Sequence, residues 1–122
     1  MKIELKGETP PKKNSRINTR SGRSFPNPRY VEWHKRVLSE LNYLLATKQI
    51  ERFEGKRVSI EINFTHSDLR NRDSDNQLSS ILDTLVDAKI IDDDNWKVVP
   101  RKVINDEYDK GNARAEIVIE EI

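Results

Sequence analysis

The feature that most constrains the fold is a strict alternation of apolar and polar residues over residues 57–65. Val58, Ile60, Ile62 and Phe64 are separated by polar side chains. In an extended chain every second side chain points to the same face. We therefore predict a half-buried strand here, whose apolar face other elements must cover.

Two segments have the helical periodicity needed to cover that face. The first begins at the helix-starting pair Asn27-Pro28 and is predicted to run to about residue 48. The second spans roughly residues 74–88, where Ser74 and Gln77 fit a capping box. Both are predicted to be amphipathic helices that pack on a sheet.

Further strands are predicted at residues 2–6, 96–104 and 113–121. Pro100 confines the middle one to an edge or a bulge. The order β-α-β-α-β-β indicates an α+β fold: one domain over residues 1–122, with two helices packed on a small mixed sheet. Residues 9–27 are rich in Pro, Lys, Arg and Ser and are predicted to form a long basic loop.

Composition narrows the functional classes. The 122 residues include 34% hydrophobic and 35% charged residues, enough for one modest core, and a domain this small often dimerises. The absence of cysteine excludes disulfides and thiolate metal sites. No apolar run has membrane-spanning length and no signal peptide is evident. We therefore expect a soluble cytoplasmic protein without membrane association.

The net charge is only +1, but the charges are segregated. Residues 1–36 hold ten basic side chains against three acidic ones. Residues 73–94 hold seven acidic side chains against one basic one: Asp73, Asp75, Asp83, Asp87, Asp92, Asp93 and Asp94 against Lys89. A divalent cation would let such an acidic segment coexist with binding to a polyanion.

Two acidic clusters are candidate metal ligands. Asp73 and Asp75 lie at the predicted helix start, where helix capping is the competing explanation. Three consecutive aspartates, Asp92 to Asp94, follow about 20 residues later, where a solvated loop is the alternative. Together they suit Mg²⁺, with Mn²⁺ as the other candidate, because hard cations prefer oxygen ligands.

Other sites fail on spacing. An EF-hand numbered from Asp73 would need glycine and glutamate where Leu78 and Thr84 stand. Zinc has only His34 and His66 available as histidine ligands, far apart in the sequence. The chain has no G-x-x-x-x-G-K-[ST] loop for a nucleotide phosphate.

Three motifs in register resemble a known family. They are Arg72-Asp73-Ser74-Asp75-Asn76, then Ile81-Leu82-Asp83-Thr84-Leu85, then Ala88-Lys89-Ile90-Ile91-Asp92-Asp93-Asp94. This series resembles the signature of RusA-type Holliday junction resolvases: R-D-x-D-N, an L-D-x-L helix element and a D-D pair after a hydrophobic turn. The resemblance covers most of the chain.

The resemblance implies a homodimer of bacterial phage or prophage origin that binds four-way DNA junctions. Such an enzyme nicks two strands symmetrically with Mg²⁺ in a bacterial or phage-infected cell. Carried over by position, the catalytic aspartates and metal ligands are Asp73, Asp75 and Asp94, and Asp93 matches the first acid of the D-D pair.

The sequence departs from the family at two positions. Ser79 stands where the family often has a lysine, so another cation such as Arg70, Arg72 or Lys89 is needed near the phosphate. Lys89 stands where the family usually has a glycine, so the second helix lacks its common C-terminal cap.

The predicted helix also separates the two acidic clusters. From Asp75 to Asp87 it rises roughly 18 Å at 1.5 Å per residue. Asp94 meets Asp75 in one subunit only if residues 88–94 run back along the helix, a distance that seven extended residues (about 23 Å) can just cover. Otherwise Asp94 reaches the metal of a partner subunit, with a dimer interface beside this loop. The apolar contacts of that interface would be Ile90, Ile91 and Trp96. The alternative is that all three residues pack inside their own subunit.

The basic residues are the candidate DNA ligands. Those of the loop are Lys12, Lys13, Arg16, Arg20 and Arg23, joined by Arg70 and Arg72 before the second helix. Phosphate contacts of this kind need no base sequence, which suits recognition of a junction by shape. Three functions stay open: a metal-dependent junction resolvase, a nuclease for other branched DNA, and a non-catalytic module that binds branched DNA.

Overall fold

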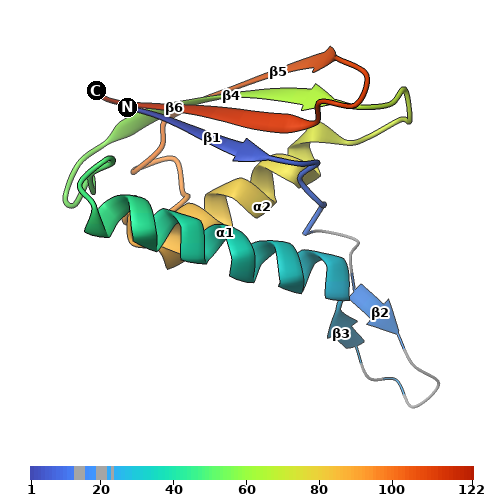
Figure 1. The fold of residues 1–122 in the computed structure, drawn as a ribbon. Helices are drawn as coiled ribbons and strands as arrows, with labels where there is room; N and C mark the ends of the chain where they lie inside the picture. Colours follow the sequence, from blue (N-terminus) through green and yellow to red (C-terminus); the bar gives the residue numbers. More distant parts are fainter. Residues whose placement is uncertain (13–15, 19–21, 23) are drawn as a thin grey trace.

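The computed structural model describes residues 1–12, 16–18, 22 and 24–122, and only the backbone of residues 16–18 and 24–26. Its main sheet has four strands in the order β1-β6-β4-β5. These strands are β1 (Lys2–Lys6), β4 (Val58–His66), β5 (Arg101–Tyr108) and β6 (Arg114–Glu121). β2 (Arg16–Asn18) and β3 (Ser24–Pro26) form a separate two-stranded hairpin that projects from the domain (Figure 1).

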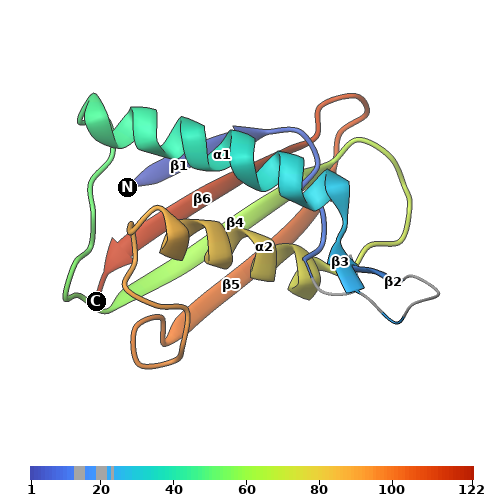
Figure 2. The same ribbon diagram turned by 90° about the horizontal axis from the view of Figure 1, so that it is seen from below.

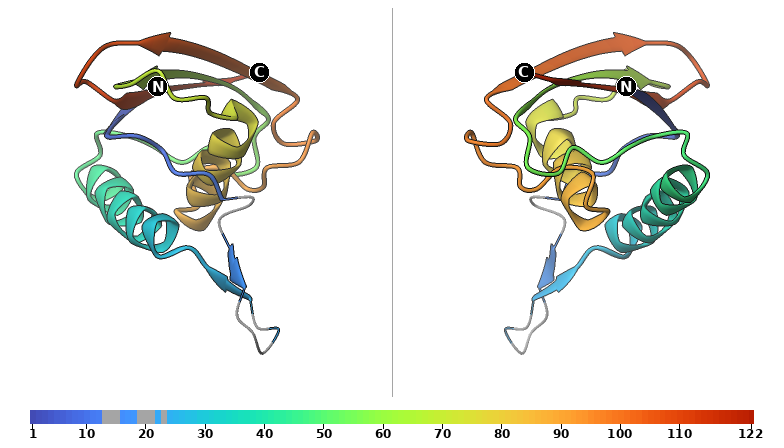
Figure 3. Two further views of the ribbon diagram at one scale, coloured as in Figure 1. Left: turned by 90° about the vertical axis from the view of Figure 1, so that its right-hand side faces the viewer. Right: turned by 90° about the vertical axis from the view of Figure 1, so that its left-hand side faces the viewer.

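Two helices, α1 (Pro28–Ala46) and α2 (Ser74–Asp87), lie on one face of the sheet and leave the other face open (Figure 3). The alternation in β4 explains this asymmetry, because Val58, Ile60, Ile62 and Phe64 are all at most 1% exposed on the helical side. The α+β prediction and its mixed sheet are therefore confirmed. No helix in the described part of the chain combines the length and apolarity that crossing a bilayer requires.

β4 and β5 pair in parallel, whereas the β1–β6 and β4–β6 pairs are antiparallel. Parallel neighbours need a crossover connection, and α2 supplies it. α2 therefore starts near the C-terminal ends of β4 and β5 and ends near their N-terminal ends (Figure 2). This places residues 67–73 and residues 88–100 at opposite ends of the sheet.

The helix ends differ in part from the predictions. Asn27 caps α1 as predicted, since its Oδ1 accepts a hydrogen bond from the Arg29 amide at 2.9 Å. The capping box of Ser74 and Gln77 is wrong: Asp73 is the N-cap of α2, and Gln77 points away from the helix start. Its Nε2 donates instead to Glu8 Oε2 and to the Thr9 carbonyl, both at 2.8 Å.

The strand predicted at residues 96–104 is also displaced. Asn95 Oδ1 accepts from the amides of Lys97 and Val98, which holds residues 96–98 in turns. β5 begins only after Pro100, at the edge of the sheet where a proline is tolerated. The proline thus marks the start of the edge strand and not its middle.

The three apolar residues of the loop between α2 and β5 that were considered for an interface differ in their exposure to solvent. Ile90 and Ile91 are 0% and 1% exposed and belong to the core of their own subunit, whereas Trp96 is 69% exposed. The prediction of an interface that uses all three residues is therefore wrong, because the two isoleucines are already buried at the end of the core beneath α2.

Lys89, which directly follows the Ala88 C-cap of α2, has an unfavourable backbone conformation. Its φ is +60°, a left-handed geometry that a residue with a Cβ adopts at a cost of about 1–2 kcal/mol. We expect Lys89→Gly to raise the free energy of unfolding by about 0.5–1 kcal/mol, since glycine offsets part of this gain with its greater entropy when unfolded.

Urea denaturation followed by circular dichroism measures this change. Lys35→Gly, an exposed lysine inside α1, is the matched control and should lower the same free energy by about 1 kcal/mol. Equal destabilisation by both substitutions would contradict the assignment of strain to Lys89.

Candidate metal-binding and DNA-binding site

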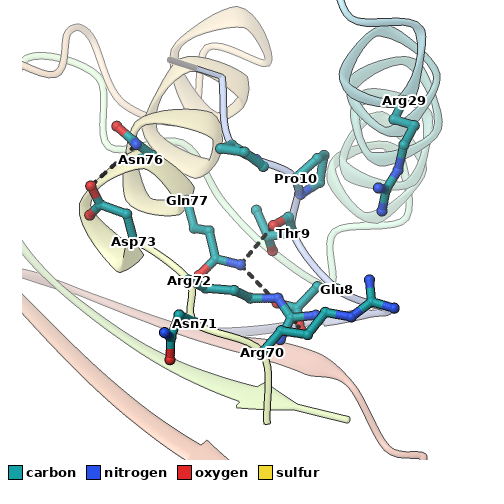
Figure 4. Close-up of a pocket in the computed structure, with 11 residues that line it drawn as sticks. Glu8, Thr9, Pro10, Arg29, Arg70, Asn71, Arg72, Asp73, Asn76 and Gln77 are labelled. Carbon is teal, nitrogen blue, oxygen red and sulfur yellow. Dashed lines mark hydrogen bonds and ion pairs between the residues drawn. The ribbon is translucent and has the colours of Figure 1, made fainter. Parts of the chain in front are cut away.

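The first acidic cluster lies at the start of α2. Asp73 is exposed, and its Oδ1 accepts from the Asp75 amide at 3.1 Å while its Oδ2 lies 3.3 Å from Asn76 Nδ2 (Figure 4). The capping role considered for Asp73 is therefore real. Asp75 is also exposed, and its carboxylate accepts no hydrogen bond from the part of the chain that the structure describes. Both line an open hollow of about 570 Å³.

The three aspartates of the second acidic cluster differ in their hydrogen bonds. Asp92 Oδ2 accepts from the Gly55 amide at 2.8 Å, which ties the loop to the segment before β4. Asp93 Oδ1 accepts from the Asp94 amide at 2.7 Å, and its Oδ2 accepts from Asn95 Nδ2 at 3.1 Å. The exposed Asp94 carboxylate accepts no bond from the described residues, so it is free to bind a ligand.

The two clusters do not meet within one chain. The 14 residues of α2 lie between them, a rise of about 20 Å, and residues 88–94 do not run back along the helix (Figure 2). Among the described residues, a different trio has its ligand atoms within 4.8 Å of one another: His34, Asp83 and Asp87. Each of the two acidic clusters, taken separately, still fits Mg²⁺, because this ion commonly uses one or two carboxylates and retains waters.

The trio lies where α1 faces α2, and its charge is balanced by a lysine. Asp83 Oδ1 lies 2.7 Å from Lys12 Nζ, and its Oδ2 accepts from the Tyr30 hydroxyl at 2.8 Å. His34 Nε2 lies 2.7 Å from Asp87 Oδ2. Partial burial would raise the pKa of Asp83, but Lys12 and Tyr30 outweigh it and the pKa is lowered. These contacts indicate an ion-pair network that joins α2 to Lys12 of the basic loop and to the first turns of α1.

A second network holds the segment that leads into α2. Arg72 makes two contacts with the Asp68 carboxylate, at 2.7 and 3.2 Å, and its Nε lies 3.3 Å from Glu8 Oε1. The hydrogen bonds from Arg72 lower the pKa of Asp68 to about 2. His66 joins Glu8 to Asp106, and Asp106 Oδ2 accepts from the Ser74 hydroxyl at 2.7 Å. The backbone on both sides of Asp73 is therefore anchored to the sheet.

The predicted DNA ligands fall into three groups. Arg70 is the most exposed, with a side chain 80% exposed at the rim of a cavity of about 370 Å³ (Figure 4), and its Nε lies at a long 3.9 Å from Asp68 Oδ2. Arg72 and Lys12 are paired with carboxylates, Asp68 and Asp83 respectively. The others lie outside the described side chains, with Arg16 placed only by its backbone in β2: Lys13, Arg16, Arg20 and Arg23.

Comparison with known proteins identifies the family. The model of the family described as endodeoxyribonuclease RusA matches residues 7–120. This chain belongs to the RusA family. It is 33% identical over 89 residues to a crossover junction endodeoxyribonuclease RusA from Aquifex aeolicus (strain VF5), an alignment that covers 70% of this chain and 64% of that relative. The chain thus spans somewhat less than two thirds of the RusA relative.

Sequence reasoning missed the residues that anchor the start of α2. Glu8 and His66 carry no motif, and only the folded sheet brings Glu8 to His66, Arg72 and Gln77. Asp83 was visible in the L-D-x-L element, but its partners Lys12 and Tyr30 lie more than 50 residues earlier. His34 lies at the helical spacing of the α1 apolar residues, and this was the one signal that pointed toward α2.

His66 makes the stability of this region depend on pH. Partial burial lowers the pKa of His66, but hydrogen bonds to Asp106 and Glu8 outweigh burial and raise it above its ordinary value. A raised folded pKa contributes stability that is complete below the unfolded pKa, near 6.5, and is lost as pH rises through the folded value.

We therefore expect the free energy of unfolding to fall as pH rises from about 6 toward 8, and this slope to flatten in His66→Gln. Urea melts at several pH values measure it. His34→Gln, which alters a histidine of the other network, is the control. A slope unchanged in His66→Gln would refute the assignment.

Proposed function

We propose that this protein is a Mg²⁺-dependent endodeoxyribonuclease that resolves four-way DNA junctions by paired symmetric nicks. The observation that carries the proposal is the exposed carboxylate pair, Asp73 and Asp75, at the anchored start of α2 in a chain of the RusA family. The name of the Aquifex aeolicus relative, a crossover junction endodeoxyribonuclease, supports the same substrate.

In this proposal Asp73, Asp75 and Asp94 hold the ion, and Asp93 orients Asp94 through the bond to its amide. When bound, Mg²⁺ supplies positive charge that polarises the scissile phosphate and activates a water. The chain contributes rigid placement: Arg72 and Ser74, on either side of Asp73, are both tied to acidic residues. Mn²⁺ is expected to substitute, since it accepts the same oxygen ligands.

Asp94 would act in trans. Because α2 separates Asp94 from Asp75 within one chain, a site with all three aspartates needs Asp94 from a second copy. The two copies would then form two equivalent sites, one for each strand that is cut. This arrangement explains how a chain of one domain makes paired nicks.

The basic residues would hold the junction arms through phosphates. The chain enters this loop beside the start of α2, where the carbonyls of Thr9 and Pro10 accept hydrogen bonds from Gln77 and Ser80. The hairpin β2–β3 projects beside the start of α1 (Figure 1). Arg70, highly exposed and close in sequence to Asp73, is suited to the phosphates nearest the ion. It would also supply the cation that Ser79 does not. Such contacts select the shape of the DNA and weaken steeply with salt.

Cleavage of a labelled synthetic four-way junction tests the activity. We expect paired symmetric nicks with Mg²⁺, none with EDTA, and a rate at least about a hundredfold lower for Asp75→Asn. Glu51→Gln, the same carboxylate-to-amide change on an exposed loop, is the control and should cut normally. Binding without any cleavage by the wild type would favour a non-catalytic module. Preferred cleavage of flaps or forks in the same assay would favour a nuclease for other branched DNA.

Mixed dimers test the action in trans. Asp75→Asn and Asp94→Asn chains are each expected to be inactive alone. After subunit exchange, a heterodimer has one site with both substitutions and one intact site, so the mixture should regain roughly a quarter of the wild-type nicking rate. If both aspartates act within one chain, every site stays defective and the mixture remains inactive.

A further inference from the structure

A cavity of about 370 Å³ lies between the segment after β1, the start of α1 and the start of α2 (Figure 4). Its size falls in the range of sites that take small organic groups. Three of its lining residues, Asn71, Arg72 and Asp73, also line the open hollow that holds Asp75. The cavity therefore adjoins the candidate metal site and shares a wall with it.

The rim of the cavity carries two arginines. Arg29, in the first turn of α1, and Arg70, in the segment before α2, are both exposed and lie on the same side of the cavity (Figure 4). The Arg29 guanidinium forms no ion pair with the residues that the structure describes, and Arg70 only approaches a carboxylate at 3.9 Å. The Glu8 carboxylate of the same cavity is already paired with Arg72 and His66. Two guanidinium groups are thus left to bind a phosphate.

The inner wall of the cavity is buried and contains polar atoms without partners. Thr9, Pro10 and Gln77 belong to this wall and are almost completely buried, and Pro11 adds apolar surface beside them. Thr9 Oγ1 and Gln77 Oε1 have no hydrogen-bond partner among the described residues. An unpartnered polar atom is unfavourable in a buried position, and it often marks the place of a water or a ligand. We therefore expect an occupant with both an apolar surface and hydrogen-bonding groups.

One nucleotide of a DNA strand combines these properties. Its phosphate suits the two arginines at the rim, and its base has an apolar face and a polar edge. A phosphate alone would fill only part of a cavity of this size. Several classes of enzyme that act on DNA turn a nucleotide out of the stack into a pocket, at a cost that is smallest where the base is already unpaired. A branch point is a place where base stacking is interrupted.

We propose that this cavity receives one nucleotide extruded from the DNA strand beside the scissile phosphate, an inference that rests on the proposed function. Arg29 and Arg70 hold the phosphate of that nucleotide at the rim. Its base packs against the two prolines, and its polar edge faces Thr9 and Gln77. Because an intact duplex resists the loss of a base from its stack, extrusion favours branched DNA over duplex DNA.

The fluorescence of 2-aminopurine tests the extrusion, because stacking quenches this base analogue. It is placed in turn at each position around the crossover of a synthetic four-way junction, with saturating protein and with EDTA so that no strand is cut. We expect a severalfold rise at one position of each strand that is cut, since none of the described residues that line the cavity is aromatic. Arg29→Ala and Arg70→Ala should each lose most of this rise. Arg36→Ala, the same change on α1 at a residue paired with Glu40, is the control and should keep it.

Anisotropy of a dye on a distant arm measures binding in the same samples. The cavity proposal is overturned if the junction is bound and no position brightens. It is also overturned if all crossover positions brighten alike and Arg29→Ala changes none of them, because the junction then opens without extrusion. A protein that does not bind the junction at all would refute this proposal and the proposed function together. A protein that shows the full fluorescence pattern but cuts nothing with Mg²⁺ would refute the nuclease function and leave the nucleotide site intact.

Discussion

Parallel pairing of β4 with β5 is the constraint on which the rest of the structure depends. Two parallel neighbours cannot be joined by a tight turn, so the chain must travel back the whole length of the sheet between them. α2 makes that return and buries its apolar side against the sheet as it does so (Figure 2). As a result, Asp73 and Asp94, which flank this one connection, lie at opposite ends of the domain.

Networks of polar side chains then hold α2 in place against the neighbouring elements. Glu8 receives Gln77, His66 and Arg72, so the segment after β1, the end of β4 and the start of α2 share one carboxylate. Asp83 performs the same task further along the helix, where Lys12 and Tyr30 meet it from the two sides of the basic loop. A carboxylate inside such a network accepts charged hydrogen bonds that are stronger than neutral ones. The loop that carries the basic residues and the helix that carries the acidic ones are thereby joined directly.

The same constraint connects the proposed activity with the proposed dimer. Since one chain does not bring its two acidic clusters together, the proposed site with all three aspartates depends on a second copy.

The sequence by itself determined the pattern of elements, because apolar periodicity follows directly from the geometry of strands and helices. Residues 57–65 alternate, the α1 and α2 segments repeat at helical spacing, and Asn27-Pro28 begins α1 as predicted. Short motifs, each formed by residues close together in the chain, also indicated the family. Tertiary structure decided what local patterns cannot contain: that Asp73, not Ser74, caps α2, that β5 starts after Pro100, and that Ile90 and Ile91 are buried. It also decided that Glu8 and His66 anchor the start of α2, since the contacts of Glu8 with His66 and with Gln77 join residues more than 50 positions apart and depend on strand order.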